Sequence, residues 1–429
     1  MIIAVNSRGD TQSASPLGWT EVPGFESAAA TYADVAYIAT SSTSAFTGTW
    51  TQNSSQPYTI GVMAFKPDVP LDPLAQWKTA RATVASIPKV LVVGDSIAEG
   101  QGASVKTNRW QDILNGALRT NAGLPAGGAG FVPNYYAVAG SSSPWGNTAA
   151  GNLTGTLNTD YDYETWIGLG GRGVQLNDTT ATETFTVYGD NAEIWYADGY
   201  GSGTSFKYQI DSGSVITVTY TSTYSQGLVV PVALGSVGSH TIKIMWNAGT
   251  PSPEGIYVYN GDKTTGIHFY DHTHSGATTD AYIGSDQDTI IIPKIAPDLA
   301  IIELVGVNDF QNSYCAPSQT LINVQAAITE LNALTKVPSI VLLIPYAVES
   351  PTTNTLGYTW ADYVTQLLTI TESNVTIVNL YSLWGTSNGT GYYDSDGIHP
   401  SDAGHAQIAS ILAGVLDPML TSLPWFGFF

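Results

Sequence analysis

Apolar and polar residues follow two different patterns along this chain, and the change from one pattern to the other divides the chain into parts. The continuous apolar run 89-KVLVVGD-95 is typical of a strand buried on both faces of a parallel sheet. Apolar residues at helical spacing follow it between Asn108 and Thr120. The same pattern returns near the C-terminus, with strands predicted at 298–306, 339–346 and 375–380 and helices at 318–334, 359–373 and 401–416. Strands and helices in alternation predict a three-layer α/β/α fold with a parallel sheet.

Residues 150–265 separate the two α/β stretches and have a different pattern of apolar and polar residues. Its residues alternate between two faces, as in 215-VITVTY-220, which is the period of half-buried antiparallel strands. Further strands are predicted at 184–198, 240–246 and 255–260, with turn residues between them and no helical pattern. We interpret the block as an inserted antiparallel β-sandwich of about seven or eight strands.

The first residues predict a further small β domain, because short apolar segments at 31–40 and 58–65 lie between Ser, Gly, Asn and Pro clusters. The prolines that follow disfavour regular structure and indicate a linker. The predicted organisation is a small N-terminal β domain at 1–67, a linker at 68–88, the α/β domain at 89–149 and 266–429, and the insert at 150–265.

The net charge of the chain limits the kinds of molecule that it can bind. Acidic residues outnumber basic ones by 35 to 14 in 429 residues, and the formal net charge of −21 argues strongly against nucleic acid or an anionic membrane as partner, because both repel a negative surface. A neutral glycan or an uncharged ester is compatible with it. The start MIIAVNSRGD lacks the pattern of a signal peptide, and no apolar run is long enough to cross a membrane, so we expect a soluble protein. The single cysteine, Cys315, excludes an intramolecular disulfide.

Three short polar sequences stand beside predicted strands and helices of the α/β part: 94-GDSI-97, 306-GVND-309 and 396-DGIHP-400. Open parallel sheets collect reactive groups at the carboxyl ends of their strands. A serine there becomes a nucleophile when a base takes its proton, and an acid can orient that base. Ser96, His399 and Asp396 are the candidates for these roles. The Asn308 side chain and the Ser96 N–H are candidate donors to the oxyanion.

In order and placement, these sequences resemble blocks I, III and V of the SGNH (GDSL-like) hydrolase superfamily. The resemblance covers about 90–150 and 266–416 and implies a serine esterase without metal or cofactor. It implies that Ser96 is the nucleophile, His399 the base, Asp396 its orienting acid, and that Ser96 and Asn308 donate to the oxyanion. Ile97 replaces the family's leucine, which is a mild change.

The family also uses a block II glycine in the oxyanion hole, and two positions compete for this role. Gly276, in 266-GIHFYDHTHSGATTD-280, follows an apolar strand and is expected to open a helix; Gly140 is the rival. We favour Gly276, which places the insert between blocks I and II, unlike compact members of the family. The insert and the segments 127-GGAGFVPNYY-136 and 17-LGWTEVPGF-25 also resemble tail-associated proteins of phages that infect actinobacteria. That second resemblance implies a virion setting, with other tail proteins or further copies of the chain as partners.

Other residues have structural interpretations that compete with functional ones. Three histidines, His268, His272 and His274, share one strand face, but metal sites usually draw ligands from separated segments, so a structural or substrate-lining role is favoured. Cys315 has no activating neighbour, and Asp309 is expected to anchor its loop. The insert's aromatic residues could stack on sugars, although we expect half or more of them in the core: Trp195, Tyr196, Tyr200, Tyr257 and Tyr259.

The sequence therefore predicts a serine esterase that removes O-acyl groups, acetyl in particular, from a polysaccharide or cell-envelope glycan through an acyl-enzyme. The alternative is a glycan-binding tail or adhesin protein that uses the hydrolase fold as a scaffold.

Overall fold

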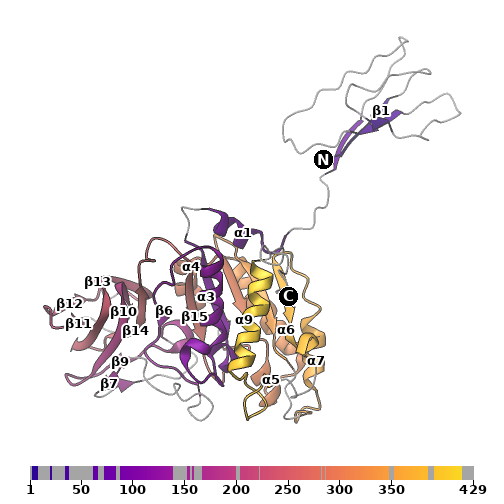
Figure 1. The fold of residues 1–429 in the computed structure, drawn as a ribbon. Helices are drawn as coiled ribbons and strands as arrows, with labels where there is room; N and C mark the ends of the chain where they lie inside the picture. Colours follow the sequence, from indigo (N-terminus) through magenta and orange to yellow (C-terminus); the bar gives the residue numbers. More distant parts are fainter. Residues whose placement is uncertain are drawn as a thin grey trace, which may run out of the picture. The chain divides into compact units, whose positions relative to one another are not determined.

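The structure is a computed structural model, which falls into two units, Met1–Leu71 and Asp72–Phe429 (Figure 1). Backbone and side chains are described for residues 72–83, 87–138, 167–199, 203–221, 223–281, 283–285, 287–346, 352–384 and 391–417. Outside these ranges only the backbone of short strands is described. Gly140 and Tyr200, which the sequence analysis singled out, lie outside the described residues.

The N-terminal unit contains a four-stranded antiparallel sheet in the order β2-β3-β1-β4. Its strands are β1 (Ile2–Ser7), β2 (Thr20–Glu21), β3 (Asp34–Tyr37) and β4 (Gly61–Phe65). Two of them, β3 and β4, fall inside the segments for which the sequence predicts strands.

The second unit is built on a five-stranded sheet, parallel throughout, in the order β15-β5-β16-β17-β18. Its strands are β5 (Lys89–Gly94), β15 (His268–Thr273), β16 (Leu299–Ile302), β17 (Ser339–Ile344) and β18 (Val375–Asn379). Successive residues of a strand point to opposite faces, so Leu91 and Val93 enter one core while Val90 and Val92 enter the other. The predicted α/β class is confirmed.

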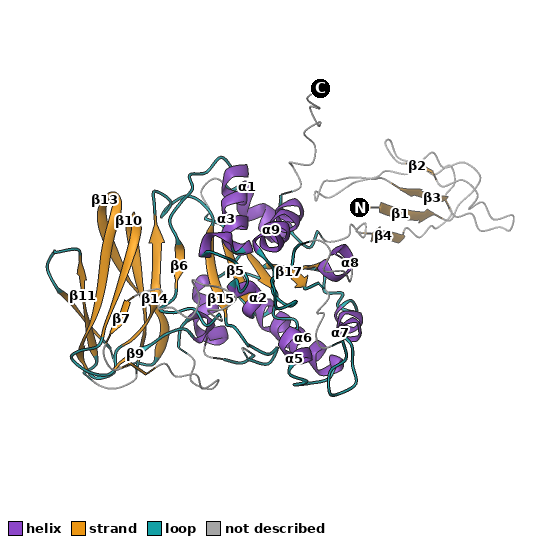
Figure 2. Ribbon diagram, turned by 60° about the horizontal axis from the view of Figure 1, so that its bottom comes forward, coloured by secondary structure: helices purple, strands orange, loops and turns teal. Residues whose placement is uncertain are grey.

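Helices cover both faces of this sheet, and Figure 2 shows α3 and α9 on one side and α6 and α7 on the other. The first face carries α1 (Ala75–Ala82), α3 (Trp110–Asn121), α8 (Leu380–Trp384) and α9 (Asp402–Leu416). The second carries α4 (Ile292–Ile295), α6 (Pro317–Asn332) and α7 (Trp360–Leu367). Short helical segments complete the unit: α2 (Ser96–Glu99), η1 (Lys106–Asn108), η2 (Leu169–Gly171), the π-helical turn η3 (Gln287–Ile291) and α5 (Val307–Gln311).

Helix α1 corrects the expectation that residues 68–88 lack regular structure. The helix begins two residues after Pro73, so the prolines precede it and do not interrupt it. Trp77 is fully buried in the core of the first face, and its indole N–H donates to the Leu416 carbonyl at 3.0 Å. This burial fixes a segment that the proline pattern alone suggested was a linker.

The seven strands of the antiparallel part form one hydrogen-bonded network. Its strands are β6 (Gly130–Val132), β7 (Asn152–Thr154), β10 (Thr182–Asp198), β11 (Ser205–Ile210), β12 (Ile216–Thr219), β13 (Ser225–Ala248) and β14 (Ser252–Tyr259), and β8 (Leu157–Asn158) pairs separately with β9 (Gln175–Leu176). Pairing of the long strands β10 and β13 is irregular between Gly189 and Asn191, and one buried core draws side chains from both of their halves. Because β6 pairs with β14, this sheet recruits a strand from before residue 150.

Hydrogen bonds from the segment at η2 connect the antiparallel part with the parallel sheet. The Gly170 N–H donates to His272 Nδ1 at 2.9 Å, and His274 Nδ1 donates to the Gly170 carbonyl at 2.7 Å. A side chain at Gly170 would place its Cβ only 2.2 Å from the Thr273 carbonyl oxygen, so glycine permits this approach. The insert thus contacts β15, the strand that precedes Gly276.

Stability is expected to fall as the pH rises from about 6.5 to 8.5, because the buried carboxyl group of Glu254 holds its proton in the folded chain. Burial raises the pKa of Glu254 to about 8, whereas unfolded glutamates titrate near 4.3. Its contribution is complete at low pH and is lost as the pH rises through the folded value. Burial lowers the pKa of His274 and His405 to about 4, so their opposite contribution is already complete above about pH 6.5.

The expected loss in the free energy of unfolding is on the order of 2 kcal/mol over this interval. Urea unfolding at the two pH values measures it. The Glu254→Gln variant, which has no proton to lose, should show a smaller drop. An equal drop in that variant and the wild type would show that Glu254 does not cause it.

Candidate active site

Ser96 lies at the sharp turn from β5 into α2. Asp95 begins the helix, and its Oδ1 accepts a hydrogen bond from the Ile97 N–H at 2.9 Å. A side chain at Gly94 would place its Cβ 2.2 Å from the Ala98 Cβ, so only glycine allows a turn this tight. The turn leaves Ser96 at the first position of α2, at the carboxyl end of β5.

Ser96, His399 and Asp396 form one hydrogen-bonded chain, although Ser96 is 303 residues from His399 in sequence. Ser96 Oγ is 2.8 Å from His399 Nε2, and His399 Nδ1 is 2.6 Å from Asp396 Oδ2. The other oxygen of Asp396 accepts from the backbone N–H groups of Ile398 and His399, both at 2.9 Å. The carboxylate therefore holds both the imidazole and the turn that carries it.

The charge on Asp396 follows from these contacts. Burial would raise the pKa of this carboxyl group, but the hydrogen bonds from the His399 side chain and from the two backbone N–H groups outweigh burial and lower the pKa to about 2. Asp396 is ionised at neutral pH, so it accepts the proton on His399 Nδ1. In that tautomer Nε2 faces Ser96 with its lone pair.

Two residues that sequence analysis missed hold the turn between Asp396 and His399 in place. The Tyr346 hydroxyl donates to the Ile398 carbonyl at 2.6 Å, and its ring stacks on Trp384 at a centroid distance of 4.6 Å. A side chain at Gly102 would place its Cβ 2.1 Å from the Pro400 carbonyl oxygen. Neither residue belongs to a short motif, and only the fold brings them to the triad turn.

Asn308 lies in α5, beyond the end of β16, and the nitrogen of its side-chain amide donates two hydrogen bonds. Nδ2 donates to Asp95 Oδ2 at 3.2 Å and to the Ala277 carbonyl at 3.0 Å. These bonds connect the turn at Ser96 with the segment that follows Gly276. Donation to a substrate oxygen would require one of them to be exchanged.

Gly276 lies in a turn after β15, with φ +85 and open space where a side chain would project. The expected helix does not begin here: the Ala277 N–H donates to the His274 carbonyl and Ala281 to Thr278, which are turn hydrogen bonds. Within the described part of the chain, neither the Gly276 N–H nor the Ser96 N–H has a hydrogen-bond acceptor. Both donors are therefore available to a ligand.

The order of the strands explains why these segments meet. β5 lies between β15 and β16, and the chain passes from β5 to β15 on one side before crossing to β16 on the other. The carboxyl ends at such a switch point form a natural crevice. Ser96, Gly276 and Asn308 follow these three neighbouring strands.

The other residues considered from sequence have structural contacts. His268 Nε2 lies 2.9 Å from the Asp262 carbonyl, and His272 and His274 bind the backbone of Gly170. In the described ranges no group of three His, Cys, Asp or Glu side chains could hold a metal ion. Asp309 anchors its loop, accepting from the N–H and hydroxyl of Thr279 and from Thr320.

Cys315 and the aromatic residues of the insert also have structural surroundings. Burial raises the pKa of Cys315 to about 12, and Asp309 adds to this, so the thiol stays protonated. Of the insert's aromatic residues, Trp195, Tyr257 and Tyr259 are buried in a core shared with the parallel sheet. The part of the chain that the structure describes also contains no helix long and apolar enough to cross a bilayer.

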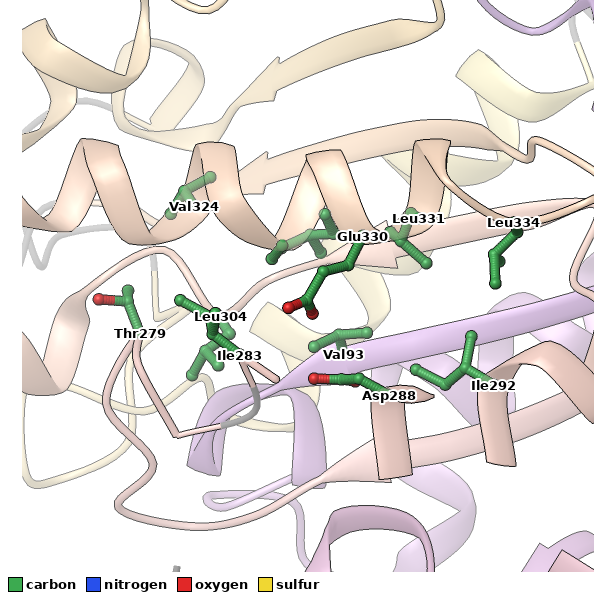
Figure 3. A pocket seen from close by; sticks show the side chains of 12 residues that line it. Val93, Thr279, Ile283, Asp288, Ile292, Leu304, Val324, Glu330, Leu331 and Leu334 are labelled. Carbon is green, nitrogen blue, oxygen red and sulfur yellow. The ribbon is translucent and has the colours of Figure 1, made fainter. Parts of the chain in front are cut away.

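A pocket with an empty volume of about 510 Å³, part of it open solvent, lies under α6 on the second face of the sheet (Figure 3). Its walls are mainly aliphatic, and the carboxylates of Asp288 and Glu330 are its charged groups. None of the five predicted site residues lines it.

Comparison with known proteins agrees with this geometry. Residues 247–407 match the GDSL-like Lipase/Acylhydrolase family. The GDSL-like match includes Gly276, Asn308, Asp396 and His399 and begins after Ser96, which the fold brings to the other residues. The chain therefore carries a GDSL-like domain of the serine ester hydrolase class. No curated protein matches the sequence.

Among solved structures, the chain is similar to one described as "Peptidoglycan O-acetylesterase in action, 5 min", with a TM-score of 0.61 and 16% identity over 82% of this chain and 96% of the other. This likeness supports the GDSL-like fold. Two family two carbohydrate esterases also match, from Cellvibrio japonicus (TM-score 0.29, 11% identity, 63% and 96% coverage) and from Clostridium thermocellum with cellohexaose (TM-score 0.31, 14% identity, 58% and 96% coverage). We base no argument on these two, because their TM-scores are low.

Proposed function

We propose that the protein is an O-acyl esterase that removes acetyl groups from a cell-envelope glycan or related polysaccharide through a serine acyl-enzyme. The observation that carries the proposal is the chain of short hydrogen bonds from Ser96 through His399 to Asp396. A serine, an imidazole and an ionised carboxylate in this order are the parts of nucleophilic acyl transfer.

In the proposed reaction, His399 Nε2 takes the proton of Ser96 as Oγ attacks the ester carbonyl. The imidazolium that forms is stabilised by Asp396 and returns its proton to the leaving alcohol. Water then attacks the acyl-enzyme with His399 again as base. The N–H groups of Ser96 and Gly276 lack acceptors in the described chain and would donate to the oxyanion, with Asn308 exchanging one of its two bonds to join them.

Three considerations support an acylated glycan as substrate. The net charge of −21 disfavours polyanionic partners, and the GDSL-like family consists of lipases and acylhydrolases. The solved structure with the higher TM-score quoted above is described as a peptidoglycan O-acetylesterase. The tail-protein setting, with a virion location and tail or self-association partners, rests on the sequence resemblance alone.

Acetate release from O-acetylated peptidoglycan tests the substrate. We expect the wild type to release acetate from this polymer but not from the same polymer after mild alkaline deacetylation, and Ser96→Ala to release none. Binding to the polymer without acetate release would contradict the esterase and favour the glycan-binding alternative.

A further inference from the structure

Glu99 is a buried carboxylate that the proposed reaction does not use. It lies in α2, three residues after Ser96, and its side chain is fully buried. Oε1 accepts from the Ala137 N–H and Oε2 from the Ser275 N–H, both at 2.7 Å. One carboxylate therefore joins the helix of Ser96 to two loops that are distant in sequence.

Each of the two loops leads to a glycine that the sequence makes a candidate for the oxyanion hole. Ser275 is the residue directly before Gly276, and Ala137 stands three residues before Gly140. A shift of the Ser275 N–H would turn the next peptide unit, whose N–H belongs to Gly276. The bond to Glu99 therefore fixes the orientation of that N–H relative to the helix that carries Ser96.

The antiparallel part of the chain supplies the charge that balances Glu99. Arg172, which follows η2, places Nη1 3.4 Å from Glu99 Oε1 and Nη2 2.9 Å from Asp271 Oδ1. Arg109 contacts the other oxygen of Asp271 at 2.8 Å and donates to the Glu99 carbonyl at 3.2 Å. All four side chains are almost completely buried, so the network is shielded from solvent.

We propose that Glu99, with Arg172 as its counter-ion, is a positioning residue that holds the Gly276 turn against the helix of Ser96 and so keeps the oxyanion hole assembled. This role rests on the proposed esterase function. Glu99 does not contact the substrate, because both of its oxygens are occupied by backbone donors in the protein interior. The insert thereby contributes to catalysis through Arg172.

The Glu99→Gln variant tests this role because it keeps the shape of the side chain. Its amide has a single acceptor oxygen, so one of the two backbone N–H groups would face an NH₂ group instead. We expect kcat for phenyl acetate to fall by about 10- to 100-fold, because a small displacement of a catalytic donor has this effect, with KM little changed. Glu99→Asp, which keeps the charge but shortens the reach, should lose activity in the same direction.

A thionoester comparison separates positioning of the hole from general destabilisation. Sulfur accepts hydrogen bonds weakly, so an assembled hole favours phenyl acetate over phenyl thionoacetate, and a displaced hole loses this preference. We expect the ratio of the two kcat/KM values to fall in both Glu99 variants. It should stay at the wild-type value in Glu183→Gln, a matched change of a buried glutamate in β10. Thermal unfolding of each variant checks that it is folded at the assay temperature.

An unchanged ratio in a folded Glu99→Gln variant would overturn the positioning role, whether or not its rate falls. Full activity in that variant would overturn it as well. Absence of ester hydrolysis in the wild type would instead refute the proposed function, and with it the role of Glu99.

Discussion

Replacing either Ser96 or His399 with alanine is expected to lower kcat for p-nitrophenyl acetate by about 10⁶-fold, the scale on which loss of a catalytic serine or histidine acts. The two side chains form one unit, joined at 2.8 Å, and each depends on the other to generate the nucleophile. The double variant should therefore be no slower than either single variant. What activity is left would come from substrate binding and the oxyanion donors.

Two control variants show whether replacing a serine or a histidine outside the site also lowers kcat. Ser382 is an exposed serine in α8, and His240 in β13 is hydrogen-bonded to Asp211. Ser382→Ala and His240→Ala should keep wild-type kcat. Additive losses in the double variant, or full activity in either single variant, would contradict a joint role of Ser96 and His399.

Asp396→Asn is expected to lower kcat by about 10⁴-fold while leaving the fold intact. The asparagine amide would donate to His399 Nδ1, which places the ring proton on Nε2 and leaves the imidazole unable to accept the proton of Ser96. The carboxylate is ionised through the working range, because its hydrogen bonds lower its pKa to about 2. Loss of activity in mildly acidic buffer would therefore not come from protonation of Asp396.

Asp394→Asn provides the control for Asp396→Asn, since both residues belong to the loop before α9. Among the described residues, Asp394 takes part in the hydrogen bonds of the loop through its backbone alone: its N–H donates to the His399 carbonyl and its carbonyl accepts from Gly397. We expect Asp394→Asn to keep a kcat close to that of the wild type. The kcat values of the two variants, measured by steady-state kinetics, should then differ by nearly the full 10⁴-fold expected for Asp396→Asn, about four orders of magnitude. Equal losses would indicate disturbance of the loop and not of the histidine tautomer.

Sequence patterns predicted the parallel sheet well because its inner strands β5, β16 and β17 are buried on both faces. A strand such as β5 must then be apolar throughout, and this leaves a clear signal. The candidate site residues at the ends of β5 and β16 were singled out for the same reason: short polar motifs stand out directly after apolar runs. His399 and Asp396 became candidates through their spacing within one turn.

Features that depend on contacts between distant segments left no such signal. Helix α1 is held by burial of Trp77, and the strand β6 is defined by its pairing with β14, more than a hundred residues later. Glu99 could be recognised only when the fold had brought Ala137 and Ser275 to its two oxygens. A period-two pattern likewise predicts antiparallel strands but does not say whether they form one sheet or two.

Labelling with a fluorophosphonate that reacts with activated serines is the most direct test of Ser96 as nucleophile. We predict that one equivalent of label is found by peptide mass spectrometry on Ser96 in the wild type, and that His399→Ala does not react on the same time scale. A hydrolytically active wild type that takes no label, or takes it on another serine, would contradict the account.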